Sequence, residues 1–435
     1  MTLVRGLRKW DLVALVINSV IGAGIFGLPS QVYALAGTYS LAAYAVAAIA
    51  IGLFVLCFAE VGSRFGGTGG PYLYTRVAFG PLIGFEVGWL MWVARIAGFA
   101  SVVNLSVAYL AFFIPAANSD AWRAVVITVV AVLLAGVNIA GLRTSATVTN
   151  VLTAGKVIPL FLLAVVGFFV IDPQRYSFAV IPAYGAFSKA TLLVMFAFAG
   201  FESALIPTGE MRDPQRHLPF SLFVGMSMVT ALYIGVQAVC IGTVPDLAHA
   251  VRPLSDPALQ IVGPAGESAV AAAALISIVG VLNAIVFSTP RLLFAMGQNG
   301  ELPRVFASTH ARFRTPVAAI VATTAAAVLL ALFSTFVSAL TVSTIARLVA
   351  YMATCAALPV MRGRTELPRP SFSAPAGLLI PAGAIALGVW LISNSPWAEV
   401  RVAVIFACVG ILLYFVSARE TRTVTAPVLS SPASD

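Results

Sequence analysis

Long apolar runs, separated by short polar or Gly/Pro-rich segments, fill most of the chain between residues 11 and 417. A membrane-spanning helix needs about 20 predominantly apolar residues, and these runs are of that order. The strands of a membrane barrel would instead alternate polar and apolar positions. The pattern therefore predicts an all-α polytopic membrane protein with twelve transmembrane helices. The predicted spans cover residues 11–35, 38–62, 81–113, 122–142, 147–171, 188–209, 218–243, 267–297, 315–334, 336–360, 375–394 and 397–417.

The first and the sixth of these spans are each interrupted by glycine and proline. Three glycines and a proline lie within residues 22–29, and the sequence Phe-Ala-Gly-Phe-Glu occupies residues 198–202. Glycine and proline disfavour a continuous helix, and broken helices at membrane depth mark binding sites between repeats. The alternative is that these glycines only allow close helix packing. We predict a five-plus-five inverted repeat, with a first repeat at 11–171, a second at 188–360, peripheral helices at 375–417 and a disordered tail at 421–435.

The composition narrows the class of protein. Apolar residues make up 60% of the chain and charged residues only 9%, whereas soluble domains carry about 25% charged residues. This leaves no room for a large soluble catalytic domain. The four cysteines lie in apolar runs, and the sequence has no nucleophile motif, phosphate-binding loop or metal-ligand cluster. We therefore expect no enzyme activity, no cofactor and no metal site.

The net charge of +9 reflects an excess of basic residues, which the predicted topology distributes unevenly between the two sides of the membrane. With the N-terminus inside, 17 Lys and Arg residues lie on the cytoplasmic side, 5 lie outside and 3 lie within spans. This asymmetry fits the positive-inside rule and predicts a cell-membrane protein with both termini in the cytoplasm. The basic residues then serve topology and lipid contact, and no nucleic-acid partner is expected. Near the cytoplasmic end of the second span, Glu60 is a predicted partner of Arg64.

We single out four ionisable residues that lie within predicted spans, where charge is costly and usually functional: Lys156, Arg95, Arg347 and Glu202. Lys156 lies about ten residues from either polar flank of its span, too deep to reach the interface easily. It is the leading candidate for a functional cation. For Glu202 we favour a structural role at the break, whereas Arg95 and Arg347 either brace helix contacts or reach a water-filled vestibule.

Several stretches of the sequence resemble the amino acid-polyamine-organocation (APC) superfamily, and in particular bacterial amino acid permeases. The resemblance keeps the order of the motifs from the first to the eighth span. It implies a ten-helix inverted-repeat core with two further peripheral helices. The matching stretches are residues 21–26, 60–65, 69–74, 198–202, 210–216 and 299–303.

The resemblance also implies a substrate site made from the backbone at the two breaks. A half-helix N-terminus offers unpaired N–H groups, and a C-terminus offers carbonyls, so one site can hold a zwitterion. The substrate carboxylate would bind at Ala23 and Gly24, and its ammonium at Ile21, Phe198 and Ala199. Two glycines, Gly22 and Gly200, would give access to the backbone. Phe196 occupies the position of an aromatic gate, with simple core packing as the alternative.

Related proteins that depend on sodium hold the ion near helices 1, 5 and 8, and the resemblance places the ammonium of Lys156 there instead. Its expected neighbours are the backbone around Gly22 and the hydroxyls of Ser288 and Thr289. Because burial disfavours the charged form of an amine, Lys156 can exchange a proton during transport. The alternative is a permanently charged lysine that braces helices 1 and 8.

These features predict a secondary transporter that imports amino acids by alternating access and proton symport. Amino acids with neutral side chains are the favoured substrates. The predicted partners are an amino acid, protons and membrane lipids, and the sequence leaves the oligomeric state open. Two alternatives remain: an exchanger of amino acids or polyamines, and a sensor that binds an amino acid without transporting it.

Overall fold

The computed structural model describes residues 9–65, 70–140, 146–202, 205 and 214–421. All regular secondary structure in that part of the chain is helical, which confirms the predicted all-α class. The α-helices are α1 (Lys9–Val20), α2 (Ala23–Ala36), α3 (Ser40–Ser63), α4 (Gly70–Phe79), α5 (Pro81–Phe113), α6 (Asp120–Ile139), α7 (Ala146–Phe168), α8 (Tyr184–Ala197), α9 (Pro214–Thr243), α10 (Ser255–Val262), α11 (Pro264–Ser288), α12 (Pro290–Gln298), α13 (Val317–Leu332), α14 (Phe336–Arg362), α15 (Leu379–Ser393) and α16 (Trp397–Thr421).

Many of these helices are long and apolar enough for a membrane. Seven segments of the described chain could cross a bilayer by length and composition, and four shorter apolar helices accompany them. The protein is therefore a multi-pass membrane protein. The predicted span 81–113 has the bounds of α5, whereas α4 and α10 lie in segments predicted as connections. The predicted tail lies outside the described residues, except for Thr421, where α16 ends.

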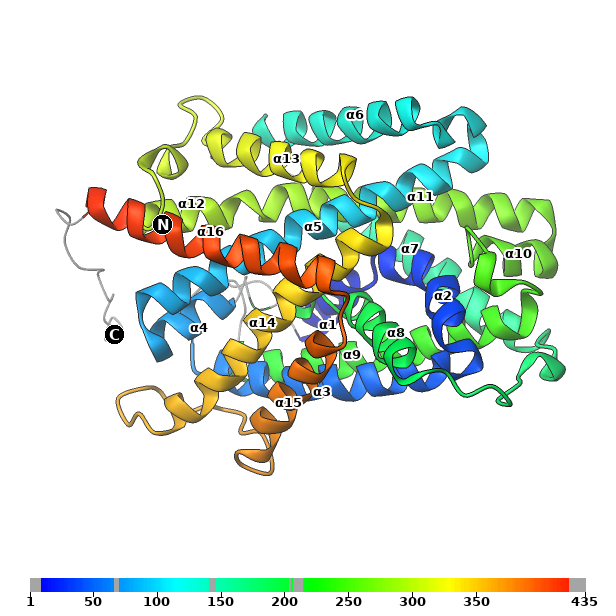
Figure 1. Ribbon diagram of the computed structural model, residues 1–435, viewed down its shortest axis with the longest axis horizontal. Helices are drawn as coiled ribbons and strands as arrows, with labels where there is room; N and C mark the ends of the chain where they lie inside the picture. The colour runs from blue at the N-terminus through cyan, green and yellow to red at the C-terminus, as the bar shows by residue number, and fades with distance from the viewer. Residues whose placement is uncertain (1–8, 66–69, 141–145, 203–204, 206–213, 422–435) are drawn as a thin grey trace.

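The long helix α5 runs through the middle of the bundle and packs against α14, α13, α11 and α16 (Figure 1). On one flank α6 packs on α13, and on the other α3 packs on α9 and α15. The short helices α1, α2 and α8 lie between these groups, where α1 contacts α9 and α2 contacts α8. Figure 1 shows α4 and α12 at one end of the bundle and α10 at the opposite end.

The outward faces of the peripheral helices are apolar. Large apolar side chains are exposed on α6, α7 and α16, for example Leu133, Phe161 and Leu412. In water such surfaces would mark an interface, but in a multi-pass membrane protein they suit contact with lipid chains. The interior around α5 is densely packed with buried aromatic and small residues, including Phe85, Phe99 and Tyr109.

Candidate functional site

The first broken helix divides into α1 and α2 at Gly22. The helical hydrogen bonds of α1 end with the Ile21 amide, which donates to the Ile17 carbonyl at 2.8 Å. Gly22 is extended, with φ −127° and ψ −150°, and α2 begins at Ala23 with no side chain capping it. The first N–H groups of a helix have no partner within the helix, so those of Ala23 and Gly24 belong to an uncapped N-terminus at membrane depth.

The second broken helix is α8, which ends at Ala197. The chain then turns tightly, because the Ala199 amide donates to the Phe196 carbonyl at 3.0 Å. Gly200 has φ +119°, a conformation that side-chain-bearing residues rarely adopt, and its amide donates to Glu202 Oε2 at 2.9 Å. Phe198 is buried, whereas Phe196 is only partly buried.

The two breaks lie directly against each other. A Cβ at Gly200 would collide with the carbonyl oxygen of Ser19, and a Cβ at Gly24 would lie 2.8 Å from the Ala197 Cα. Both positions therefore require glycine, because a side chain would push the backbones apart. The structure thus brings together the residues predicted around Gly22 and Gly200.

Lys156 lies on α7 and reaches the C-terminus of α1. Its ammonium donates to the carbonyl oxygens of Asn18 at 2.6 Å and Ile21 at 2.8 Å, and the residue is only 6% exposed. The last carbonyls of a helix lack partners and carry partial negative charge, so a cation is favourable there. The predicted contact with the helix 1 backbone is present, and it uses the carbonyl of Ile21, which was assigned to the substrate ammonium.

Among the described contacts, the hydroxyls of Ser288 and Thr289 make no hydrogen bond to Lys156. The Ser288 hydroxyl donates to the Ala284 carbonyl at 2.8 Å and accepts from Arg95 Nη1 at 2.9 Å. The buried Thr289 hydroxyl has no hydrogen-bond partner in the described part of the chain. Both hydroxyls lie at the junction of α11 and α12, and the hydrogen bonds of the Lys156 ammonium go to backbone carbonyls instead.

A buried ion pair lies just beyond the second break. Glu202 Oε1 accepts from Arg347 Nη1 at 2.8 Å, and Oε2 accepts from the Tyr351 hydroxyl at 2.6 Å. The side chains of Glu202 and Arg347 are 2% and 11% exposed. Sequence reasoning identified both ions but missed their pairing and missed Tyr351. The spacing of Arg347 and Tyr351, four residues apart on α14, places them on one helix face and was the available signal.

Tyr233 on α9 is a second residue that the sequence did not reveal. Its hydroxyl lies 3.1 Å from the carbonyl oxygens of both Val20 and Ala197, and the residue is fully buried. These carbonyls end α1 and α8, so one hydroxyl bridges the two broken helices. A single tyrosine within an apolar run gives no sequence signal for such a role.

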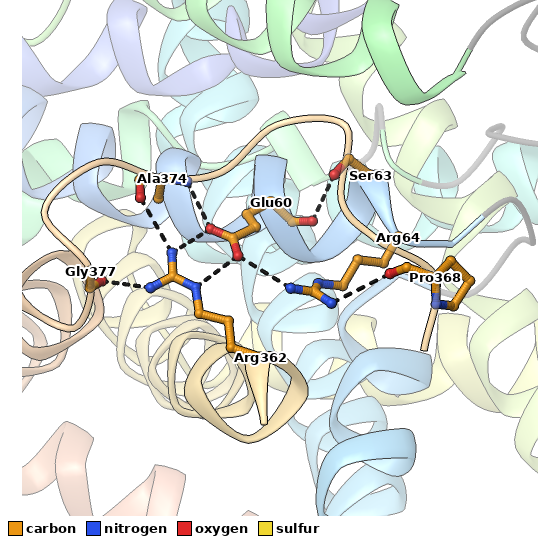
Figure 2. Close-up of polar contacts among 7 residues, drawn as sticks. All are labelled: Glu60, Ser63, Arg64, Arg362, Pro368, Ala374 and Gly377. Atoms are coloured by element: carbon orange, nitrogen blue, oxygen red, sulfur yellow. Dashed lines mark hydrogen bonds and ion pairs between the residues drawn. The ribbon is translucent and has the colours of Figure 1, made fainter. Parts of the chain in front are cut away.

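A separate polar cluster forms at the end of α3 (Figure 2). The Glu60 carboxylate accepts from Arg362 Nε at 2.8 Å, from Arg362 Nη2 at 2.5 Å and from the Ala374 amide at 2.7 Å. Its predicted partner Arg64 also contacts it, at 3.4 Å. Because Arg362 additionally donates to the Gly377 carbonyl at 2.8 Å, this cluster fastens the connection between α14 and α15 to α3.

A multi-pass helical membrane protein with two broken helices that touch in its interior belongs to the class of membrane transport proteins. Residues 7–418 match the family model for amino acid permeases, and the chain belongs to this family. The predicted resemblance to the APC superfamily is therefore confirmed.

Curated relatives extend along nearly the whole chain. The methylthioribose transporter of Bacillus subtilis is 28% identical over 439 residues, which cover 96% of this chain and 94% of the relative. The branched-chain amino acid permease BcaP of the same species is 26% identical, with the same coverage. Its serine/threonine exchanger SteT is 28% identical, covering 92% of this chain and 94% of the relative. These similarities indicate a transporter rather than an enzyme.

Proposed function

We propose that this protein is a secondary active transporter that imports neutral amino acids across the cell membrane by alternating access, coupled to protons. One observation carries this proposal: two broken helices meet in the interior, and the N-terminus of α2 is uncapped where it touches the end of α8. Uncapped amides next to helix-end carbonyls suit a zwitterionic head group, because each backbone end matches one of its charges.

The proposed architecture has twelve spans, arranged as repeats 11–171 and 188–360 with peripheral helices at 375–417. The positions of the breaks support this division, because each break lies in the first predicted span of its repeat. The distribution of basic residues supports cytoplasmic termini, and α4 and α12, which carry Arg76 and Arg291, lie at the same end of the bundle (Figure 1).

In the proposed binding mode, the amides of Ala23 and Gly24 hold the carboxylate of the amino acid. The carbonyls of Phe198 and Ala199 hold its ammonium. Ile21 can contribute as a third acceptor, because a carbonyl oxygen has two lone pairs and Lys156 uses one of them. Gly22 and Gly200 allow the substrate to approach the backbone.

A neutral side chain fits the surroundings of this site. Phe196 is partly buried beside the break, and its ring lies near α5, where a Cβ at Gly98 would be 3.9 Å from the ring. The buried carboxylate of Glu202 is already paired with Arg347 and Tyr351, so it is not available to a cationic substrate. Phe196 is accordingly proposed as an aromatic gate over the substrate.

Lys156 is the proposed proton-coupling residue, with its ammonium in the place of a sodium ion. When charged, it supplies two hydrogen bonds to the end of α1. Charge-assisted hydrogen bonds contribute about 1.5–3 kcal/mol each, so loss of the proton would weaken the attachment of α1 to α7. The protonation state of Lys156 and the position of helix 1 are thereby linked. Ser288 and Thr289 are not included in this coupling mechanism, because the ammonium bonds to the backbone.

Amino acid exchange is the second candidate function, favoured by the similarity to the exchanger SteT. In that case Lys156 is a permanent structural cation. An amino acid sensor without transport is the third. Counterflow in the absence of a pH gradient favours exchange, and binding without concentrative uptake favours a sensor.

The test begins with a thermal-shift screen of the purified protein against amino acids, polyamines and methylthioribose. The stabilising compound is then followed in proteoliposomes with an imposed pH gradient. We expect gradient-driven accumulation in the parent and in the control Lys189→Ala, and its loss in Lys156→Ala. Accumulation by Lys156→Ala at the parental level would refute proton coupling through this residue.

A further inference from the structure

The side chain of Phe336, the first residue of α14, lies on the backbone of the broken first helix. A Cβ at Gly27 would be 2.8 Å from Phe336 Cζ and 2.9 Å from Leu105 Cδ1, so the ring occupies the space that a side chain would take. Gly27 follows the break by one helical turn. The Phe336 backbone is held in turn by α5, because the Ser101 hydroxyl donates to the Phe336 carbonyl at 2.9 Å.

Two cavities meet at this aromatic ring. One has a volume of about 310 Å³ and reaches along α2 to Gln31, and the other has a volume of about 500 Å³ and reaches the start of α6 at Asp120. Phe336 and Asn104 line both of them. The ring therefore lies where open space approaches the break in helix 1 from the end opposite α4 and α12.

The corner between α13 and α14, which carries Phe336, is fixed by an arginine from α6. Arg123 Nη2 donates to the carbonyls of Ala331 at 2.9 Å and Ser334 at 2.7 Å. Arg123 Nε donates to Asn104 Oδ1 at 2.9 Å, and Asn104 Nδ2 donates to Ala331 at 3.1 Å. The Ala331 carbonyl lies in the last turn of α13 and the Ser334 carbonyl just after it, where a helix has unsatisfied acceptors and partial negative charge. The guanidinium thus joins α6, α5 and the end of α13.

We propose that Phe336 is the barrier on the outer side of the substrate path and that Arg123 is the residue that positions it. Arg123 holds the α13–α14 corner, the corner sets the start of α14, and the start of α14 places the ring on Gly27. Loss of Arg123 releases the corner and favours the open position of Phe336. The proposal rests on the proposed transport function, since it assigns a barrier to that substrate path.

The experiment measures access to the site rather than transport, so its outcome is separable from that of the transport assay. A reporter cysteine replaces Gly98, one turn deeper along α5 than Ser101, in a chain whose four native cysteines are replaced. Purified protein in detergent is labelled with a polar maleimide over time. Because one charge-assisted hydrogen bond corresponds to about a tenfold change in an equilibrium, we expect Arg123→Gln to raise the labelling rate roughly tenfold. Phe336→Ala should raise it at least as much, and Arg123→Lys less.

Two further variants separate a local effect from general loosening. Gly27→Ala pushes the ring away without altering the arginine, and it should also speed labelling, whereas Gly52→Ala adds a Cβ with nothing within 4 Å and should not. Arg175→Gln removes a partly exposed arginine paired with Asp172 and serves as the matched control. The proposal is overturned if Arg123→Gln labels within twofold of the parent, or no faster than Arg175→Gln. A monodisperse elution profile with the parent's retention is required of each variant compared.

Discussion

The ion pair between Glu202 and Arg347 offers a quantitative test of how the second break is held. Arg347 Nη1 lies 2.8 Å from Glu202 Oε1, and the two side chains are 11% and 2% exposed. Substitution Arg347→Met leaves the Glu202 carboxylate buried, with the Tyr351 hydroxyl and the Gly200 amide as donors and with Arg95 as the remaining cation that interacts with it electrostatically. Substitution Glu202→Gln instead leaves the guanidinium without this counter-charge.

Breaking a buried ion pair by removing one partner costs about 3–5 kcal/mol, because the remaining charge stays in a medium of low dielectric constant. Replacing both partners with neutral residues of similar volume is often neutral or stabilising. We therefore expect each single variant to lose about 3–5 kcal/mol of unfolding free energy. The double variant should recover most of it, so its loss should be smaller than either single loss and far below their sum of about 6–10 kcal/mol.

The assay is reversible unfolding of the purified protein in detergent, for the parent, both single variants and the double variant. Arg175→Met is the control, because Arg175 and Asp172 form a partly exposed pair 3.5 Å apart that should contribute under about 1 kcal/mol. Additive losses in the double variant would refute the reasoning. So would an Arg347→Met loss no larger than that of the control.

Two further predictions concern other contacts. Gly24→Ala inserts a Cβ 2.8 Å from the backbone of α8, and such overpacking costs about 1–3 kcal/mol. Uptake in proteoliposomes should therefore fall by about tenfold, whereas Gly52→Ala should transport at the parental rate. Glu60→Gln removes the charge that binds residues 363–378, the connection between α14 and α15, to α3. Trypsin should therefore cut this connection faster than in the parent, whereas Glu366→Gln within the same connection should leave the rate of cutting unchanged. Equal cutting of both variants would contradict the assigned role of the carboxylate.

The sequence was informative where structure depends on local pattern. The apolar run 81–113 predicted α5 with its observed bounds, and the glycines at 22–29 predicted the first break. The short helix α4 (Gly70–Phe79) was missed because a run of ten residues with a weak apolar pattern cannot be distinguished from a connecting segment. Helix ends and interruptions thus follow from composition within a window of a few turns.

Contacts between distant parts of the chain were harder to foresee. Glu202 and Arg347 are 145 residues apart, and no local pattern specifies that the segment after α8 meets α14. Ser288 was expected beside Lys156 but bonds to Arg95, because the rotation of α11 about its axis decides which side it faces. The contact of Lys156 with helix 1 was expected from the family resemblance, and it has a simple physical basis, since a buried ammonium needs acceptors and a helix break supplies unpaired carbonyls.

The attachment of Lys156 to α1 has a consequence for how the protein responds to its medium. The ammonium belongs to the chain, so its effective concentration at the carbonyls of Asn18 and Ile21 is set by α7 and not by dissolved salt. A free cation would occupy the same position only in proportion to its concentration and affinity. We therefore expect the end of helix 1 to be held to the same extent in a sodium-rich and a sodium-poor environment, and in the proposed mechanism a change in the protonation of Lys156 releases it.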